Sequence, residues 1–312
     1  MDAYQKIEAL KALIDQDLRP LITGDYRLLE IPDYPNVGDV LIFQGEIDFL
    51  RSVEFRCKEM STMSSFGTRL PKIPESDLLI LSGGGYFGDL WPRGPNFQAR
   101  ILELYPKNPI LILPQSVYFA DKGKLESAIR RYGEHSNLRI CLRDRASYEF
   151  IRNNFKNEAY LIPDMAFYAN VPQRKSGVSC DRELLLMRND KELLGGAFLE
   201  SLRNMPGIEV SDWPSMRVGG IACKVMNFCR SHPRHVGRFS DLFSKYVYRR
   251  ALLRSGIRFI SPYAKVYSTR LHGCILSLLM GKDVVMIDNS YGKNSHLYET
   301  WLSDCDNIKL VE

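Results

Sequence analysis

Short apolar runs that alternate with stretches of helical spacing limit most strongly what this chain can fold into. Residues 78–81 (LLIL) and 110–113 (ILIL) are apolar at every position, and residues 139–142 and 159–162 are similar runs. A run of this length without alternation is typical of a parallel strand that is covered on both faces. The segments between the runs, residues 96–105, 121–132 and 146–153, have the pattern of helices. This β-α-β series predicts a doubly wound parallel sheet.

The length of the chain indicates two domains. It has 312 residues, more than a single hydrophobic core usually organises. We place the first Rossmann-like domain at residues 1–172, the second at 173–312, and a linker in the polar segment 171–181. The second domain has expected strands at 183–187, 208–210, 265–268 and 284–287, and its last helix, 295–302, can pack back on the first domain. The expected fold is therefore α/β, with two doubly wound domains facing across a cleft, where ligands bind beyond the carboxyl ends of the strands.

Composition excludes several classes of protein. Hydrophobic residues make up 45% of the chain and charged residues 25%, as in ordinary soluble globular proteins. No apolar run approaches the length of a membrane span, and residues 1–18 resemble an amphipathic helix more than a signal peptide. The seven cysteines are widely spaced without a Cys-x-x-Cys pair, and the five histidines form no ligand set. We therefore expect a cytoplasmic protein with no metal and no bound cofactor.

The excess of positive charge is concentrated in one stretch. Residues 217–254 contain nine Lys or Arg residues and one acid, Asp241, interleaved with apolar and aromatic side chains. Such a stretch can lie on an anionic membrane surface, or it can be the solvated face of helices with an ordinary buried side. Nucleic acid is not an expected partner, because no recognised nucleic-acid motif accompanies the charge.

The segment 269–274 (TRLHGC) carries the most distinctive chemistry. It follows the expected strand 265–268 and opens an apolar helix, so Arg270 and His272 lie beside the unpaired N–H groups of a helix N-terminus. A phosphate or carboxylate there would meet a fixed cation, backbone donors and an imidazole. The alternative is that Arg270 pairs with a structural carboxylate and His272 caps the helix.

Polar loops also follow the other expected strands. They contribute Asn36, Asp39, Gly84, Gly85, Asp89, Gln115, Ser116, Arg143 and Lys293. Asp39 can either cap the following helix or project into the cleft. The glycine-rich loop 82–89 allows close approach of backbone to a ligand, but it matches neither the dinucleotide-binding nor the P-loop pattern.

Taken together, these loops indicate a transferase. Arg143, Arg270 and Lys293, with His272, imply an anionic small molecule. Asp39 and Asp89 imply hydroxyl groups that must be oriented or deprotonated. An anionic donor and a hydroxylated acceptor are the two substrates of a group-transfer reaction.

The order of these motifs resembles the polysaccharide pyruvyl transferase family. The similar segments are NVGDVLI (36–42), LSGGGYFGDLWP (81–92), PQS (114–116), LRDRAS (142–147), PDMAF (163–167), TRLHG (269–273) and DNSYGKNSHLYETW (288–301). The resemblance implies a GT-B-type pair of domains and a reaction that uses phosphoenolpyruvate as co-substrate to build a cyclic pyruvate ketal across two hydroxyls of a sugar. Many relatives have Asn where this chain has Tyr86.

The resemblance also implies roles for particular residues. Arg270, Leu271 and His272 would bind phosphoenolpyruvate together with Lys293 and an arginine of the first domain, for which Arg143 matches better than Arg145. We expect His272 to be the general acid, because imidazole titrates near neutral pH, and Asp39 to be the base, with Asp89 as the alternative. The expected acceptor-binding residues are Asn36, Asp39, Gly84, Gly85, Asp89, Gln115 and Ser116.

The expected acceptor is a galactose-type residue of a lipid-linked oligosaccharide. An enzyme with that acceptor would work at the inner face of the cytoplasmic membrane and could touch it through residues 217–254. Two other functions remain open at this point. One is a GT-B glycosyltransferase that uses a nucleotide-sugar, and the other is a non-catalytic glycan- or anion-binding protein.

Overall fold

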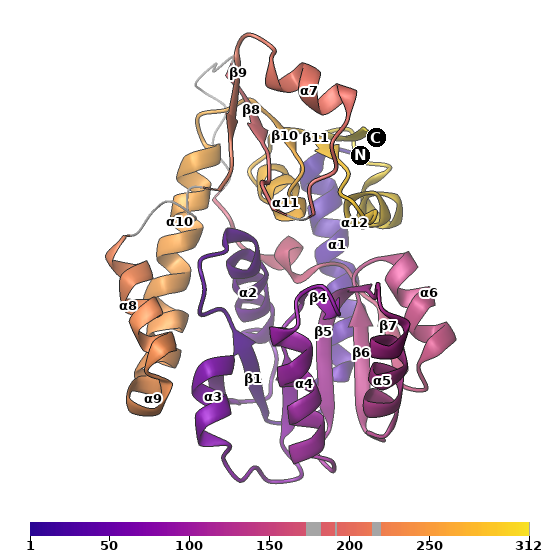
Figure 1. The fold of residues 1–312 in the computed structure, drawn as a ribbon, viewed down its shortest axis with the longest axis vertical. Coiled ribbons are helices and arrows are strands. Elements are labelled where there is room, and N and C mark those ends of the chain that lie inside the picture. The colour runs from indigo at the N-terminus through magenta and orange to yellow at the C-terminus, as the bar shows by residue number, and fades with distance from the viewer. Residues whose placement is uncertain (173–181, 191, 214–219, 312) are drawn as a thin grey trace.

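The protein is built on two parallel β-sheets (Figure 1). The computed structural model describes residues 1–172, 182–190, 192–213 and 220–311. The first sheet has seven strands and the second has five. This architecture confirms the expected α/β class with two Rossmann-like units. The predicted linker lies largely in residues 173–181, outside the described residues.

The first sheet has the strand order β2-β1-β3-β5-β6-β7, with β4 paired to β5. Its strands are β1 (Tyr26–Ile31), β2 (Cys57–Thr62), β3 (Leu78–Leu81), β4 (Gly84–Gly88), β5 (Ile110–Tyr118), β6 (Leu138–Leu142) and β7 (Glu158–Leu161). Its helices are α2 (Val37–Leu50), α3 (Met63–Arg69), α4 (Arg93–Leu104), α5 (Lys122–Gly133) and α6 (Arg145–Asn154). Every residue of β3 is fully buried, as its unbroken apolar sequence requires. The sequence did not predict β2, a partly exposed edge strand, or β4, which forms within the glycine-rich segment.

The second sheet has the order β12-β11-β10-β8-β9. Its strands are β8 (Glu183–Leu186), β9 (Ile208–Ser211), β10 (Lys265–Ser268), β11 (Asp283–Ile287) and β12 (Ile308–Val311). The helical segments beside it are α7 (Ala197–Arg203), α11 (Leu271–Leu279), α12 (Lys293–Leu297) and η5 (Tyr298–Leu302). Trp301 of η5 donates a hydrogen bond to the carbonyl of Arg143 (2.7 Å), so this last helical segment contacts the loop after β6.

The helices from the middle of the second half pack on the first sheet's helices. They are α8 (Ile221–Ser231), α9 (Pro233–Phe243), η4 (Ser244–Tyr248) and α10 (Arg249–Ile260), on the left flank of Figure 1. A Cβ at Gly256 of α10 would lie 2.6 Å from Val37 of α2, so only glycine lets these helices come this close. Asp241 of α9 accepts hydrogen bonds from the Thr62 amide (2.9 Å) and the Ser65 hydroxyl (2.8 Å).

Helix α1 (Ala3–Leu18) joins the two halves on another side. It contacts both the 3-10 turn η2 (Met165–Tyr168) and α11. At its start, the Ala3 amide donates to Asn307 (2.9 Å), and Lys6 forms an ion pair with Asp304. The halves are thus held together both by α1 and by the helices α8 to α10.

Candidate active site

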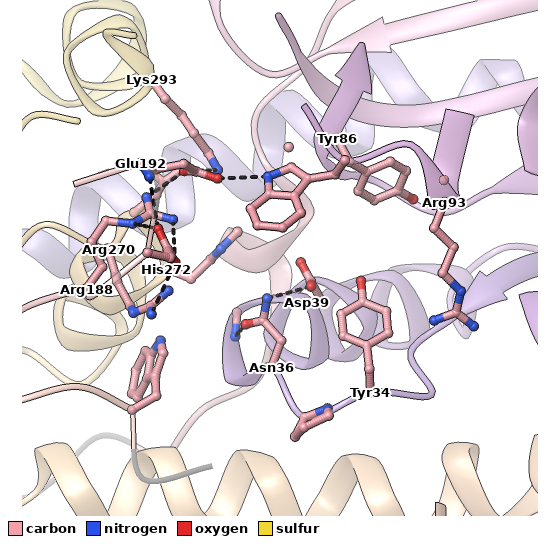
Figure 2. Close-up of a pocket in the computed structure, with 18 of the residues that line it drawn as sticks. Tyr34, Asn36, Asp39, Tyr86, Arg93, Arg188, Glu192, Arg270, His272 and Lys293 are labelled. Atoms are coloured by element: carbon pink, nitrogen blue, oxygen red, sulfur yellow. Dashed lines mark hydrogen bonds and ion pairs between the residues drawn. The ribbon is translucent and has the colours of Figure 1, made fainter. Parts of the chain in front are cut away.

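A cavity of about 480 Å³ lies between the two sheets. Residues that follow β1, with β4 and the segment after it, form one wall. Residues that follow β8, β9, β10 and β11 form the other. Its lining includes Tyr34, Asn36, Asp39, Gly85, Tyr86, Trp91, Arg93, Arg188, Asp190, Glu192, Trp213, Arg230, Arg270, Leu271, His272 and Lys293. Figure 2 shows Arg188, Arg270, His272 and Lys293 gathered at one end and Tyr34, Tyr86 and Arg93 toward the other.

Two arginines occupy equivalent positions on neighbouring strands. Strands β8 and β10 are paired so that Leu186 lies opposite Ser268, and each arginine, Arg188 or Arg270, comes two residues later. The Arg188 amide also donates to the Thr269 hydroxyl (2.9 Å), which fixes the two turns side by side. The sheet register therefore brings both guanidinium groups to the same edge of the cavity.

Carboxylates orient the Arg270 guanidinium. Asp212 directly follows β9 and accepts hydrogen bonds from Nε and from Nη2 of Arg270, the latter at 2.6 Å. Asp190 lies 3.6 Å from Nη2 of the same group. The third nitrogen, Nη1, makes no hydrogen bond within the described part of the chain. Arg270 thus pairs with a carboxylate, as one reading of the sequence predicted, and still lines the cavity with one nitrogen available.

Glu192 connects Arg188, Lys293 and Trp91. Its carboxylate accepts a hydrogen bond from Trp91 Nε1 (2.9 Å), lies 2.5 Å from Arg188 Nη1 and 3.9 Å from Lys293 Nζ. Burial lowers the pKa of Lys293 to about 8, because Glu192 only partly offsets it and Arg143 and Arg188 repel the charge. Burial alone would raise the pKa of Glu192, but Lys293 and Arg188 outweigh it and hold the pKa at about 2.

His272 lies between the first turns of two helices. It is in the first turn of α11, and a Cβ at Gly38, in the first turn of α2, would lie 2.6 Å from its Nδ1. Its Nε2 lies 3.4 Å from Asp164 Oδ2. The N-cap residue of α11 is Arg270, and no side chain caps this helix. The predicted alternative in which His272 caps α11 is therefore wrong, and the helix N-terminus stays open toward an anion.

Arg143 lies next to the cavity, behind the lining residue Gly85. Its side chain is fully buried, donates to Asp164 (2.7 Å) and Ser116 (2.8 Å), and leaves Nη2 without a hydrogen-bond partner in the described structure. A Cβ at Gly85 would lie 2.7 Å from that Nη2 and 2.6 Å from Lys293 Nζ. Burial would raise the pKa of Asp164, but Arg143 and His272 outweigh it, so the pKa is well below its ordinary value. Arg143 therefore adds positive charge next to the cavity without lining it.

The opposite end of the cavity combines a carboxylate with aromatic rings. Asn36 caps α2 by accepting a hydrogen bond from the Gly38 amide (2.9 Å), and its side-chain amide donates to Asp39 (2.7 Å). Asp39 is therefore not the cap of α2, and its carboxylate lines the cavity. Burial, with the neighbouring Asp39 carboxylate, raises the pKa of Tyr34 well above its ordinary value. Aromatic faces beside a carboxylate suit a sugar, whose rings stack and whose hydroxyls donate.

Comparison with known proteins identifies the family of the chain. Residues 36–291 match the family described as Polysaccharide pyruvyl transferase. The chain belongs to this family. The chain is 31% identical to the candidate pyruvyl transferase EpsO of Bacillus subtilis (strain 168), over 99% of this chain and 93% of that protein. It is 27% identical to Pyruvyl transferase 1 of Schizosaccharomyces pombe, over 91% of this chain and 72% of that protein.

A solved structure supports the fold alone. A functionally uncharacterised protein of Klebsiella pneumoniae superposes with a TM-score of 0.63 and 18% identity, covering 97% of this chain and 98% of that chain. The family resemblance recognised in the sequence is thus confirmed, and so is the class of enzyme, a pyruvyl transferase.

For a pyruvyl transferase, the structure brings together only some of the predicted site residues. Asn36, Asp39, Gly85, Arg270, Leu271, His272 and Lys293 line the cavity. Gln115 and Ser116 are buried, with Gln115 donating to the Ser82 carbonyl (2.9 Å), and Gly84 does not line the cavity. Asp89 accepts hydrogen bonds from the amides of Ala120 and Asp121 and lines a separate cavity between α4 and α5.

Several residues of the pyruvyl transferase cavity were not predicted. They are Tyr34, Trp91, Arg93, Arg188, Asp190, Glu192 and Trp213. Asp212, which pairs with Arg270 without lining the cavity, was not predicted either. Arg188 had a usable signal, because it follows its strand at the same offset as Arg270. Trp91 and Asp212 had none, because their partners Glu192 and Arg270 are distant in sequence. Within the described residues, no group of three or more His, Cys, Asp or Glu side chains is arranged to hold a metal ion.

Proposed function

We propose that this pyruvyl transferase moves the pyruvate unit of phosphoenolpyruvate onto two hydroxyls of a sugar, forming a cyclic ketal and releasing phosphate. One observation carries the proposal: Arg270, His272 and Lys293 converge on one cavity that also contains the Asp39 carboxylate. Cations suit the donor, which has a phosphate and a carboxylate, and a carboxylate suits an acceptor hydroxyl that must lose its proton.

The donor end of the cavity is prepared for negative charge. Arg270 presents Nη1, Lys293 presents an ammonium whose closest carboxylate oxygen is 3.9 Å away, and the uncapped N-terminus of α11 adds backbone donors. Such prepositioned donors stabilise developing charge by about 3 kcal/mol each. Asp212 and Glu192 hold the cations in place, so little reorganisation is needed when the donor binds.

In the proposed reaction, His272 donates a proton to the methylene carbon of the donor, which becomes a methyl group. Asp39 accepts the proton of one sugar hydroxyl, whose oxygen forms a bond to the donor's C2. The C2–O bond to phosphate then breaks, and phosphate leaves with its electron pair. The second hydroxyl attacks the same carbon and closes the ketal. Of the two hydroxyl protons, one replaces the proton supplied by His272 and the other leaves with phosphate.

We place the acceptor sugar between Asp39 and the aromatic rings of Tyr34 and Tyr86. Asn36 lines the cavity beside Asp39, whereas Gly85 lies against Lys293 at the donor end. A galactose-type residue of a lipid-linked oligosaccharide is the acceptor that we propose. The enzyme would then work at the inner face of the cytoplasmic membrane, in contact with it through residues within 217–254.

The experiment is to incubate the protein with phosphoenolpyruvate and a set of water-soluble β-galactosides. We expect phosphate release to equal the amount of sugar that gains a pyruvate ketal, as measured by mass spectrometry and NMR. Arg270→Ala and His272→Ala should each lower turnover by about 10²-fold or more, as expected for loss of a transition-state donor or a general acid.

The matched control is Arg258→Ala, which removes an exposed arginine of α10 and should keep full turnover. Transfer of sugar from a nucleotide-sugar without phosphoenolpyruvate would overturn the proposal. So would a product that keeps a vinyl group, since that product has no second sugar–carbon bond.

A further inference from the structure

One flank of the molecule exposes an unusual concentration of apolar side chains. Ile221 and Phe228 on α8, Phe239 and Leu242 on α9, and Tyr246 and Val247 on η4 are between 47% and 82% exposed. We call these six residues and the exposed cations between them the outer helical face. The three helical segments contact one another and lie along one side of the protein (Figure 1). Phe239, Leu242 and Tyr246 are three and four positions apart, which puts them on the same side of the helix.

The charges on this face have one sign. Lys224, Arg230, Arg234, Arg238 and Arg250 are exposed there. The single acid between residues 220 and 258, Asp241, is turned inward and buried against Thr62 of β2 and against Ser65 and Arg69 of α3. The exposed surface therefore presents cations and large apolar groups together, without a neutralising carboxylate from these helices.

We infer that the outer helical face rests on an anionic lipid bilayer. Aromatic and aliphatic side chains insert at the boundary of headgroups and acyl chains, and the surrounding cations pair with lipid phosphates. A second copy of the chain is a poorer occupant, because a symmetric interface would bring two acid-free cationic surfaces together. No helix in the described part of the chain has the length and hydropathy of a membrane span.

The outer helical face is continuous with the cavity. Arg230 of α8 is exposed on this flank and also lines the cavity. A sugar that remains attached to a membrane lipid would thus enter at the edge of the docked face. This last point depends on the proposed function, whereas docking itself does not.

The test is sedimentation of the whole protein with vesicles. We expect binding to phosphatidylcholine vesicles that contain phosphatidylglycerol, weaker binding at high salt, and little binding to pure phosphatidylcholine. Two variants test the apolar side chains and the positive charge of the outer helical face separately. Phe239→Ser/Leu242→Ser/Tyr246→Ser removes the apolar side chains, and Arg234→Glu/Arg238→Glu/Arg250→Glu reverses the charge. Each should lower vesicle affinity at least about tenfold. The first loses the side chains that insert at the headgroup boundary, and the second turns attraction to the anionic surface into repulsion.

Matched controls are Arg100→Glu/Lys122→Glu/Arg130→Glu for charge and Tyr4→Ser/Leu104→Ser/Met205→Ser for exposed apolar area, all away from this flank. Both should bind vesicles as the unaltered protein does. Absence of binding to anionic vesicles would overturn the inference. So would equal losses in the controls, or an apolar variant that changes the oligomeric state in sedimentation velocity.

The same variants are assayed with phosphoenolpyruvate and a water-soluble galactoside. None of the altered residues lines the cavity, so turnover should be unchanged. If the unaltered protein turns over substrate but does not bind vesicles, the docking inference is wrong and the proposed reaction stands. If it binds vesicles but shows no turnover, the proposed reaction is wrong and the docking inference stands.

Discussion

His272 and Arg143 meet at the same oxygen of Asp164. Nε2 of His272 lies 3.4 Å from Oδ2, and Arg143 donates to that oxygen at 2.7 Å. Arg143 comes from the first sheet and His272 from the second, so one buried carboxylate connects the chemistry of both halves. The histidine that we propose as the acid is thereby oriented by a charge that has almost no contact with solvent.

Asp164→Asn should destabilise the protein strongly. The change leaves Arg143 buried without its counter-charge, which typically costs ~3–5 kcal/mol. Urea unfolding at pH 7 measures the loss, and adding Arg143→Met should restore part of it because no buried charge then remains. Since the pKa of Asp164 is lowered on folding, its contribution is present above its unfolded pKa and lost as pH falls through the folded value. Unchanged stability in Asp164→Asn would contradict this account.

Asp212→Asn should weaken binding of phosphoenolpyruvate. Arg270 would keep its charge but lose the carboxylate that fixes its guanidinium, so we expect KM for the donor to rise about tenfold with a smaller change in kcat. The control is Glu209→Gln on β9, the strand that Asp212 follows, because the ion pair of Glu209 with Arg182 is exposed and contributes little. Steady-state kinetics of the two variants separate the outcomes, and equal KM values would argue against the role of Asp212.

Activity should fall as pH rises through about 8. The pKa of Lys293 is lowered to about 8, so above that value the free enzyme loses one cation from the donor end of the cavity. We expect kcat/KM for phosphoenolpyruvate to decrease above this pH, because the pH dependence of this ratio reflects the pKa values of groups in the free enzyme. Lys293→Arg should shift the decrease beyond the measured range, while Lys309→Arg, an exposed lysine, should leave it in place.

Gly38→Ala should disable the enzyme without unfolding it. The new Cβ would lie 2.6 Å from Nδ1 and 3.0 Å from Cβ of His272, so the imidazole must move away from its position beside Asp164. We expect kcat to fall by about 10²-fold, the usual scale of acid catalysis. Gly67→Ala in α3 is the control, since its Cβ meets nothing within 4 Å. That variant should keep activity and gain about 0.4–1 kcal/mol in thermal or urea unfolding.

Much of the fold could be predicted from periodicity. Residues 78–81 and 265–268 were predicted as strands and form β3 and β10. Edge strands were harder, because β2 has mixed polar residues and is held by pairing to β1 and by contact with α9. Residues 217–254 were expected to be a basic stretch, either on a membrane surface or as the solvated face of helices, and the helices α8 to α10 form largely within it. Their packing on α2 and α3 could not be read from the sequence, because nothing local specifies a partner so far along the chain.

The site was predictable where a residue's position on a strand determines its place. Arg270 and His272 follow β10, and the carboxyl edge of the sheet carries them into the cavity. Arg143 also follows its strand, yet it turns toward Ser116 and Asp164 and stays buried. Asp89 turns away to bind the backbone of residues 120 and 121. Side-chain direction depends on such tertiary partners, which strand-end position alone does not reveal.

The two halves are connected by α1 and also by the helices α8 to α10. These two connections constrain how substrates can enter and products can leave the cavity. Halves joined at a single place could open about it, but here α1 contacts both η2 and α11, and α10 contacts α2. We expect entry and exit to depend on exposed lining residues such as Arg230. We therefore expect turnover to depend more on the length of the acceptor's sugar chain than on substitutions in the segments that join the two halves.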